Sequence, residues 1–581
     1  MTPLPKRWEI APSAPADQLE RFPDLHPLMV QVLYNRRITD PAEVATFLDG
    51  RDDTANPFAL RGMSRAVSRI RRALRRDEPI AVYGDFDADG VTATALLVQT
   101  LRALGGRVRP YIPHRTEEGY GLNEEALTVL RRGGIRLVVT VDCGVGAFDE
   151  IAAANRLGLD VVVTDHHHVD SRLPEAWAVI DPKQGHGRHA EVPDKPPNPL
   201  AGVGVAYRLA QALLRSHRQT PVNDQEVSLR EEELLDLVAL GTVADIVDLR
   251  GENRALVRRG LERINRMERP GIRALCRLAG LKPGAVDATA IGYVLGPRLN
   301  AAGRLAEAKA AYQLLVTSDP AEAEELAATL DGLNRERQRL TREAHEMARR
   351  IVVAAEDDGP LLFVAAPEFL PGIVGLVASR LLDEFYRPAV VVEVSEGFSR
   401  GSCRSIEGFH MAEALQACDE LLVRHGGHAA AAGFTVDNRN LEPLARRLQA
   451  MAAQQLSADD LTPALAVDAE VQLSEMSWNL LEELTRLEPC GCGNRQPVFV
   501  SRGVRVGRHG AVGREGKHLK LALSDGSAWW DAIAFRQGAW AGRLPPVVDI
   551  AYHLELNEWR GERRLQLNVQ DIRPAGKDLS M

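Results

Sequence analysis

The sequence of 581 residues has few cysteines and no long hydrophobic run. Only Cys490 and Cys492 lie close together among six scattered cysteines, which fit a reducing compartment. A single C-x-C motif without a second pair of ligands is a poor zinc site. We therefore interpret these two cysteines as small residues in a glycine-rich turn. No segment approaches the ~20 apolar residues that cross a bilayer, and the first residues lack the apolar core of a signal peptide. We therefore expect a cytoplasmic protein with no membrane contact.

An excess of positive charge is also missing. The formal net charge of −9 excludes a general polyanion binder, so contacts with a nucleic acid would need local basic patches. With 45% hydrophobic and 26% charged residues, the composition is that of a folded, soluble protein rather than a disordered or fibrous one. A chain of this length is too long for one core and predicts several domains, about three to five.

Residues 79–182 alternate short apolar segments with helical patterns. Strands are expected at 79–83, 137–141, 160–164 and 176–180. Helices are expected at 91–104, 123–132 and 147–157, the second of them capped by Asn123. Such alternation predicts an α/β domain with a parallel sheet covered on both faces.

Acidic or histidine side chains follow each of these strands. In chain order they are Asp85, Asp87 and Asp89, then Asp142, then Asp165, His166 and His167, and finally Asp181. A single aspartate after a strand is more often an ordinary turn residue. However, parallel sheets bind ligands at the carboxyl ends of their strands, and clustered carboxylates repel one another unless cations lie between them. The set as a whole therefore predicts a metal site.

A further carboxylate, Asp245, lies in the apolar helix expected at 233–249. A buried unpaired charge would be costly there, so we expect Asp245 to complete the metal site; the alternative is a helix-end residue that faces water. Aspartate and histidine without thiolates favour Mn²⁺ or Mg²⁺. Two such ions, about 3.5–4 Å apart, are a standard apparatus for phosphodiester hydrolysis.

These motifs resemble the DHH phosphoesterase superfamily and, over nearly the whole chain, the bacterial RecJ family within it. The resemblance is carried, in this order, by residues 82–90 (VYGDFDADG), 141–144 (VDCG), 164–167 (TDHH), 241–245 (GTVAD) and 296–304 (GPRLNAAGR). Each motif alone is weak, but the ordered set is specific.

The resemblance implies roles for individual residues. The implied ligands of two Mn²⁺ or Mg²⁺ ions are Asp87, Asp89, Asp142, His166 and Asp245. Close supports or additional ligands would be Asp85, Asp165 and His167, which complete the catalytic set. Implied contacts with the substrate come from Arg115, Arg298, Asn300, Arg304, Ser402, Arg404 and His428. The last three lie in glycine turns that suit phosphate, while a structural salt bridge is an equal alternative for each arginine.

The same resemblance implies a multidomain α/β architecture. An N-terminal module at 1–60, with no assigned chemistry, would precede a parallel-sheet DHH catalytic domain with a helical extension at 61–319. A long linking helix at 320–355, an α/β DHH-associated domain (DHHA1) at 356–460 and an OB-fold domain at 461–581 would follow. Apolar and alternating segments between glycine turns independently predict a small C-terminal β-barrel. Aromatic residues available there for base stacking or for the barrel core are Trp529, Trp530, Phe535 and Trp559.

Two positions depart from the family pattern. Phe369-Leu370 stands where RecJ proteins commonly carry Trp-His, so any contact of that imidazole is absent. Cys490-Gly491-Cys492 replaces an apolar residue, with no consequence expected.

The resemblance implies a single-stranded-DNA-specific 5′–3′ exonuclease that releases 5′-mononucleotides in DNA repair and recombination. Its partners would include a single-strand-binding protein and a RecQ-like helicase. The alternative is a phosphodiesterase of the same superfamily for short oligonucleotides or cyclic dinucleotides, although a tiny substrate needs neither a barrel nor a long linker. A non-catalytic strand-binding protein would be expected to have lost the metal motifs, which are intact here.

Overall fold

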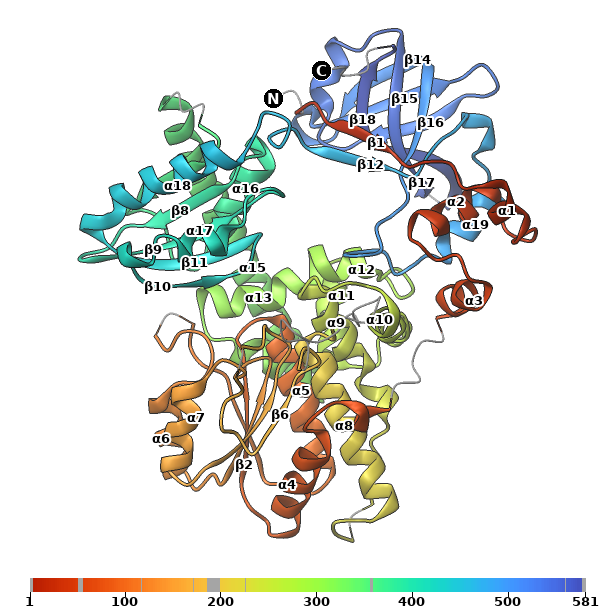
Figure 1. The fold of residues 1–581 in the computed structure, drawn as a ribbon. Helices are drawn as coiled ribbons and strands as arrows, with labels where there is room; N and C mark the ends of the chain where they lie inside the picture. The colour runs from red at the N-terminus through yellow and green to blue at the C-terminus, as the bar shows by residue number, and fades with distance from the viewer. Residues whose placement is uncertain are drawn as a thin grey trace. The chain divides into compact units, whose positions relative to one another are not determined.

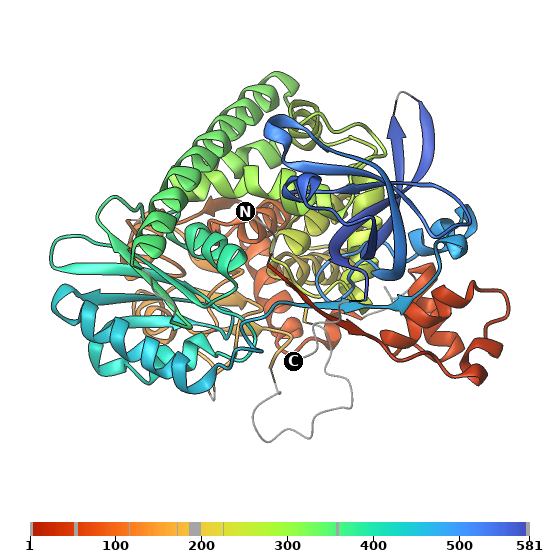
Figure 2. The ribbon, with the colours of Figure 1, turned by 90° about the horizontal axis from the view of Figure 1, so that it is seen from above.

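The computed structural model describes residues 4–50, 56–115, 117–170, 172–184, 199–224, 226–355, 359–559 and 561–576. They form two compact units. The parallel-sheet unit comprises Asp49–Gln338 and Pro489–Arg495, and the barrel unit comprises Met1–Leu48, Arg339–Glu488 and Gln496–Met581. The 35-residue helix α15 (Pro320–Ala354) runs unbroken across the boundary at residue 338 (Figure 2), as expected for the linking helix.

The parallel-sheet unit is built on five parallel strands in the order β3-β2-β4-β5-β6 (Figure 1). Their bounds are Val108–Tyr111, Ile80–Gly84, Leu137–Val141, Asp160–Thr164 and Ala178–Ile180. One face packs against α4 (Met63–Arg75), α5 (Ala88–Ala103) and α8 (Gly202–Gln219), and the other against α6 (Glu124–Arg132) and α7 (Phe148–Arg156). The predicted doubly covered sheet is confirmed, because strands buried on both faces consist of apolar, largely β-branched residues.

Helices extend this unit after α8. Their bounds are α9 (Leu235–Ala244), α10 (Gly251–Ile264), α11 (Pro270–Leu278), α12 (Ala288–Ala290), α13 (Gly296–Leu305) and α14 (Lys309–Val316). The helix expected at 233–249 is shorter than predicted, because α9 ends at Ala244 and Asp245 is its C-cap. Ile246 then adopts φ +61°, which takes the chain out of the helix.

The barrel unit contains a mixed sheet in the order β10-β11-β9-β8-β7. These strands span Leu422–Gly427, Ala431–Asp437, Phe398–Arg404, Ala389–Glu393 and Leu362–Ala366, and only β7 and β8 pair in parallel. The C-terminal part of α15 packs on the β7–β8 half of one face of this sheet, together with helix α16 (Val374–Phe385). The opposite face is covered by α17 (Met411–Gln416) and α18 (Leu441–Gln455).

A six-stranded sheet forms the predicted C-terminal barrel. Its order is β13-β14-β15-β16-β18-β17, and pairing of β14 with β17 closes it. The strands span Ala469–Glu470, Phe499–Val512, His518–Ser524, Trp530–Ala534, Glu562–Pro574 and Val547–Trp559, and α19 (Trp478–Thr485) follows β13 along the chain. Trp529 and Phe535 are more than half exposed and therefore available for stacking, whereas Trp530 is half-buried. The side chain of Trp559 lies outside the described residues.

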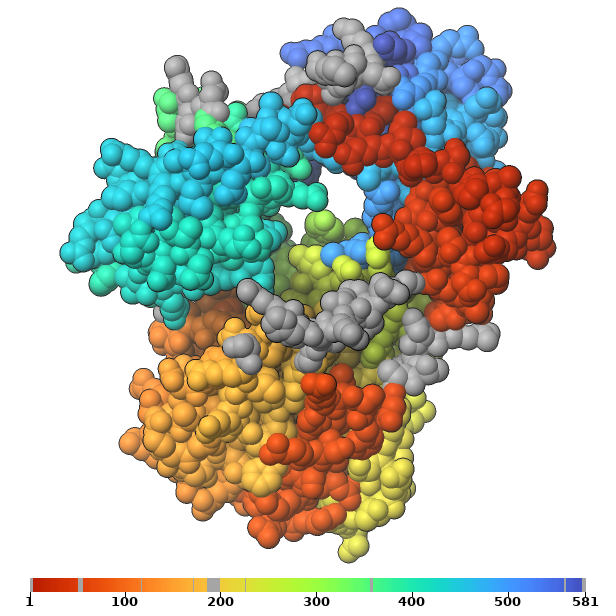
Figure 3. All heavy atoms as spheres, viewed as in Figure 1, coloured from red at the N-terminus to blue at the C-terminus, as the bar shows by residue number. Residues whose placement is uncertain are grey.

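The N-terminal residues pack against this barrel, as the space-filling view shows (Figure 3). Strand β1 (Arg7–Ile10) pairs with β12 (Ala464–Val467), and α1 (Ala16–Glu20), α2 (Pro27–Asn35) and α3 (Pro41–Asp49) follow. The Trp8 indole donates to Asp571 Oδ2 at 2.7 Å, and Arg573 lies 3.9 Å over its ring. The first 48 residues are thus part of the barrel unit.

Residues Pro489–Arg495 belong instead to the parallel-sheet unit. The Leu249 N–H donates to the Cys492 carbonyl at 2.8 Å, and a Cβ on Gly491 would come within 2.7 Å of Leu249 Cδ1. Gly493 has φ +67°. The chain around Cys490 and Cys492 is a tight glycine turn, as expected, and the six cysteines form no disulfide in the described residues. Within those residues, no helix combines the length and the apolar character that crossing a bilayer requires.

Candidate metal centre

The ends of β2, β4 and β5 bring the predicted carboxylates and histidines together. Three overlapping groups have ligand atoms within 4.8 Å of one another: Asp85, Asp87 and Asp142; Asp142, His166 and His167; Asp89, His166 and Asp245. Neighbouring parallel strands end at the same edge, so residues that are far apart in the chain meet there. The five side chains predicted as ligands therefore lie together, whereas Asp181, which follows β6, belongs to none of the three groups.

His166 lies at the centre of this cluster. Its Nε2 is 3.1 Å from Asp142 Oδ1, 3.5 Å from Asp245 Oδ2 and 3.9 Å from Asp89 Oδ2. His166 is 7% exposed, and Asp89 and Asp142 are also buried. An imidazole nitrogen surrounded by carboxylate oxygens is a donor set that suits Mn²⁺ and Mg²⁺.

The electrostatics of the cluster also fit a cation. Burial, reinforced by the neighbouring aspartates, raises the pKa of Asp89 to about 7 and that of Asp245 to about 9. The same causes hold the pKa values of Asp85 and Asp142 well above the ordinary range. Oδ1 of Asp85 is buried and has no hydrogen-bond partner within the described residues. A bound cation would stabilise the ionised carboxylates that burial and mutual repulsion disfavour.

Helices α8 and α9 hold Asp89 in place. Its carboxylate accepts the N–H groups of Gly202, at 2.7 Å, and Val203, at 2.9 Å, from the first turn of α8. A Cβ on Gly241 of α9 would lie 2.7 Å from Asp89 Oδ1, so only glycine permits this close approach. The sequence interpretation missed Gly202, although two glycines at a helix start, Gly202 and Gly204, are a recognisable signal of close packing.

Asp165 orients the two histidines that follow it. It accepts the Val145 N–H at 2.9 Å, the His166 N–H at 2.8 Å and Nδ1 of His167 at 2.7 Å. Burial raises the pKa of Asp165, but these bonds and the charge of His167 more than offset it, so that the pKa lies below its usual value. Burial lowers the pKa of His167, but the bond to Asp165 and the charges of Asp165 and Asp85 together raise it above its usual value. These contacts support the prediction of Asp165 as a close support.

Tyr120 is a second neighbour that the sequence interpretation missed. Its hydroxyl is 3.2 Å and 3.3 Å from the two ring nitrogens of His167, and it donates to the Asp142 carbonyl at 3.3 Å. A single tyrosine in a loop carries no sequence signal that would have identified it.

Of the predicted substrate contacts in this unit, Arg115 lies near the cluster. Its guanidinium is 4.9 Å from the Phe86 ring, and burial lowers its pKa while the charges of Asp85 and Asp87 raise it. An arginine in this position can neutralise a phosphate held beside the carboxylates.

Helix α13 carries three further predicted contacts. Arg298 pairs with Asp331 of α15 at 3.0 Å and donates to the Val294 carbonyl at 2.7 Å. The Asn300 side-chain oxygen accepts the Ala88 N–H at 2.7 Å, at the start of α5. Arg304 lies in the last turn of α13. The structure gives Arg298 and Asn300 structural partners, and their contact with a substrate stays a prediction.

Ser402, Arg404 and His428 belong to the barrel unit, whereas the carboxylates belong to the parallel-sheet unit. Arg404 donates to Ser402 Oγ at 3.3 Å and to the Cys403 carbonyl at 2.8 Å. Ser402 and Arg404 lie in strand β9, so the glycine turn predicted for them is wrong. His428 is exposed just after β10. Phe369 stands at the position of the tryptophan in the Trp-His pair that RecJ proteins commonly carry. It is 1% exposed and packs with α16.

The parallel sheet and its carboxylate–histidine cluster define a DHH phosphoesterase, and residues 79–242 match the model of the DHH family, N-terminal domain. Residues 358–457 match the DHHA1 domain, and residues 467–571 match the RecJ OB domain. The chain belongs to the RecJ family.

Relatives that align over nearly the whole of this chain support this assignment. The single-stranded-DNA-specific exonuclease RecJ of Salmonella typhimurium is 36% identical over 577 residues, 96% of this chain and 98% of the relative. The protein of the same name from Bacillus subtilis is 37% identical over 573 residues, 97% of this chain and 70% of the relative.

Solved structures show the same fold. RecJ from Thermus thermophilus in complex with Mn²⁺ superposes with a TM-score of 0.82 at 31% identity, covering 98% of this chain and 80% of that one. Its complex with Mg²⁺ gives a TM-score of 0.77 at the same identity, covering 98% and 79%. The divalent ions of these structures agree with the donor set of the cluster described above.

Proposed function

We propose that this chain is a metal-dependent exonuclease specific for single-stranded DNA, which hydrolyses phosphodiester bonds from the 5′ end and releases 5′-mononucleotides. The observation that carries the proposal is that relatives named for this activity align over nearly the whole chain, while every predicted ligand meets in one cluster. When bound, two Mn²⁺ or Mg²⁺ ions would activate water and stabilise the charge that builds on the phosphate.

The chain's own residues prepare that chemistry. Asp165 holds the orientation of the His166–His167 segment, and α8 fixes Asp89 through two backbone N–H groups. The guanidinium of Arg115 supplies positive charge beside the carboxylates. Fixing ligands and charge in advance lowers the cost of reorganisation during the reaction.

The cellular setting is part of the proposal. By the resemblance, the enzyme would act in the cytoplasm in DNA repair and recombination, together with a single-strand-binding protein and a RecQ-like helicase.

An end-labelling experiment tests the activity and its polarity. One single-stranded oligonucleotide is labelled at the 5′ end in one sample and at the 3′ end in another, and each is digested with Mn²⁺ beside a duplex control. We expect immediate release of a labelled mononucleotide from the 5′ end and gradual shortening of the 3′-labelled strand. Reverse polarity, or hydrolysis of dinucleotides and cyclic dinucleotides alone, would place the activity in another branch of the superfamily.

Arg404→Ala is expected to reduce the preference for a 5′-phosphorylated strand about tenfold, because charge-assisted hydrogen bonds to phosphate contribute ~1.5 kcal/mol or more. The measurement is the ratio of kcat/KM on 5′-phosphate and 5′-hydroxyl strands. Arg446→Ala, on the exposed side of α18 and paired with Glu442, is the control. An unchanged ratio in Arg404→Ala would remove this residue from the end-binding site.

A further inference from the structure

The β9–β11 half of the mixed sheet has an open outer face. Phe398, Arg400, Ser402 and Arg404 alternate along β9 toward this face, and the intervening residues are buried. On β8 the same face is covered, because Ala389 and Val391 pack against α16. Phe398 on β9 is instead 53% exposed, and Val423 on β10 is 60% exposed.

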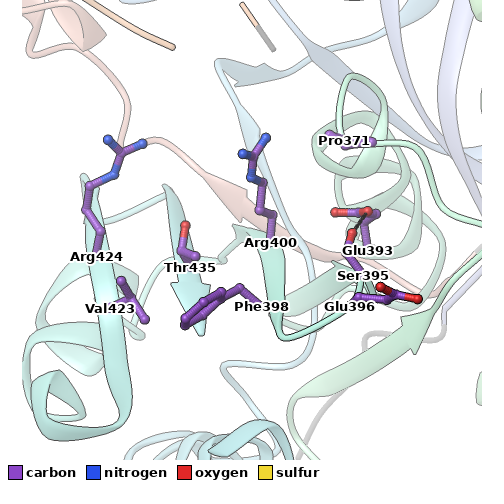
Figure 4. A pocket seen from close by; sticks show the side chains of 9 residues that line it. All are labelled: Pro371, Glu393, Ser395, Glu396, Phe398, Arg400, Val423, Arg424 and Thr435. Carbon is purple, nitrogen blue, oxygen red and sulfur yellow. Dashed lines mark hydrogen bonds between the residues drawn. The ribbon is translucent and has the colours of Figure 1, made fainter. Parts of the chain in front are cut away.

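Strand register places two arginines on either side of a threonine on this face. Thr435 of β11 is paired with Arg424 of β10 and with Arg400 of β9. Both guanidiniums point in the same direction, away from the sheet, with Thr435 between their side chains and Phe398 below (Figure 4). These residues line a hollow of about 670 Å³. A β-bulge between Leu422 and Arg424 lies at its edge, a feature that re-aims side chains at sheet edges.

Within the described residues, neither of these two guanidiniums lies in an ion pair. Throughout the described chain, the side chains of Arg400 and Arg424 make no hydrogen bond or ion pair, whereas Arg439, Arg446 and Arg447 of the same sheet domain are paired with carboxylates. Glu393 of β8 is paired with Arg400 in the strand register, and with Glu396 it borders the hollow on the side of Arg400 away from Arg424 (Figure 4). The Glu393 carboxylate accepts the Ser395 hydroxyl. Two cationic side chains on one face that make no ion pair suit an anion from outside.

We propose that Arg400, Thr435 and Arg424 bind a backbone phosphate of single-stranded DNA and that Phe398 stacks against one of its bases. The proposal deepens the proposed function and rests on it for the choice of ligand. A guanidinium pair and a hydroxyl match a phosphate diester, and an exposed aromatic face accepts any base. Ser402 and Arg404 lie on the same face, one and two steps of about 6.8 Å further along β9, so the site continues the predicted phosphate contacts. The two glutamates disfavour an acidic peptide with several carboxylates but leave room for one phosphate beside the arginines.

The test is the salt dependence of strand binding by the full-length protein. A fluorescent strand of about 30 nucleotides is titrated in EDTA, which prevents hydrolysis, at several salt concentrations. For single strands the slope of log K against log[salt] is about −0.7 per neutralised phosphate charge. Because the two arginines share one phosphate, Arg400→Ala/Arg424→Ala is expected to reduce the magnitude of the slope by about 0.7 and to weaken binding about tenfold at low salt. Phe398→Ala is expected to weaken binding about tenfold with an unchanged slope, because stacking releases no counterions.

Arg446→Ala/Arg447→Ala is the matched control. It removes the same charge from the same domain on α18, which packs on the opposite face of the sheet, and it should keep the wild-type slope. Equal slopes and affinities in the two double variants would overturn the proposal. The proposal would also be overturned if Arg400→Ala/Arg424→Ala no longer bound an acidic peptide but still bound strands as the wild type does. The hollow would then be a protein-docking surface. If the wild-type protein binds strands but hydrolyses none, the proposed function fails. The salt-dependence slopes of the variants would still show whether Arg400 and Arg424 bind a phosphate.

Discussion

In Asp87→Ala, hydrolysis of single-stranded DNA in Mn²⁺ is expected to fall at least about 10³-fold, equivalent to ~4 kcal/mol of transition-state stabilisation. Asp87, Asp85 and Asp142 form one of the three groups of potential metal ligands. Removing one carboxylate from this group weakens its binding of a cation. Strand affinity in EDTA should stay within about threefold of wild type, because the predicted phosphate contacts lie on other residues. The measurements are single-turnover hydrolysis and strand binding.

Asp87→Asn separates the loss of metal binding from a loss of structure. Asp87 is the N-cap of α5 and accepts the N–H groups of Asp89 and Gly90 at 2.9 Å and 3.0 Å. Alanine removes this cap, at a cost of about 1 kcal/mol, whereas asparagine keeps a capping oxygen without the charge. We expect Asp87→Asn to be as inactive as Asp87→Ala with a Tm close to wild type. Asp149→Asn, in the first turn of α7, should remain active. Near-normal hydrolysis by Asp87→Asn would contradict its assignment as a ligand.

The metal-free protein is expected to lose thermal stability as the pH rises from about 5 to 9. Burial and neighbouring carboxylates raise the pKa of Asp89 to about 7 and that of Asp245 to about 9. A carboxyl group with a raised pKa binds more protons in the folded than in the unfolded state, so its contribution is present at low pH and disappears as the pH passes the folded pKa. Asp165, whose pKa is lowered, acts in the opposite direction, and its contribution is lost only in acid.

Divalent cations should reverse this loss, and more strongly at higher pH, because the ligands must be deprotonated to bind. Mn²⁺ at about a hundredfold excess over its Kd would add about 2.7 kcal/mol for one site, or about 4 °C in Tm for a unit of this size. The measurement is thermal unfolding at about pH 5, 7 and 9 in EDTA and in Mn²⁺. Asp245→Asn should flatten the profile in EDTA. A Tm that is independent of pH in EDTA and unaffected by Mn²⁺ would exclude the cluster as a metal centre.

Much of the parallel sheet could be predicted from local pattern. Strands β2, β4 and β5 are continuous apolar segments followed by acidic residues, so both their existence and their polar ends can be recognised in the sequence. Strand β3 was missed because it contains Arg109 and Pro110. A proline is tolerated there because β3 is an edge strand, and no local signal distinguishes such a strand from a loop.

The sequence alone determined which residues could serve as ligands, because residue type and the end of a strand are local properties. Tertiary structure decided which of them meet. Asp245 comes within 3.5 Å of His166 only because α9 ends at Ala244 and packs beside α5 and α8. Arg400 and Arg424 face one hollow only because β9 and β10 both pair with β11 in one register. Contacts of this kind depend on non-local packing and on strand register. Both are selected by the burial of whole helices and sheet faces, so no short stretch of sequence encodes them.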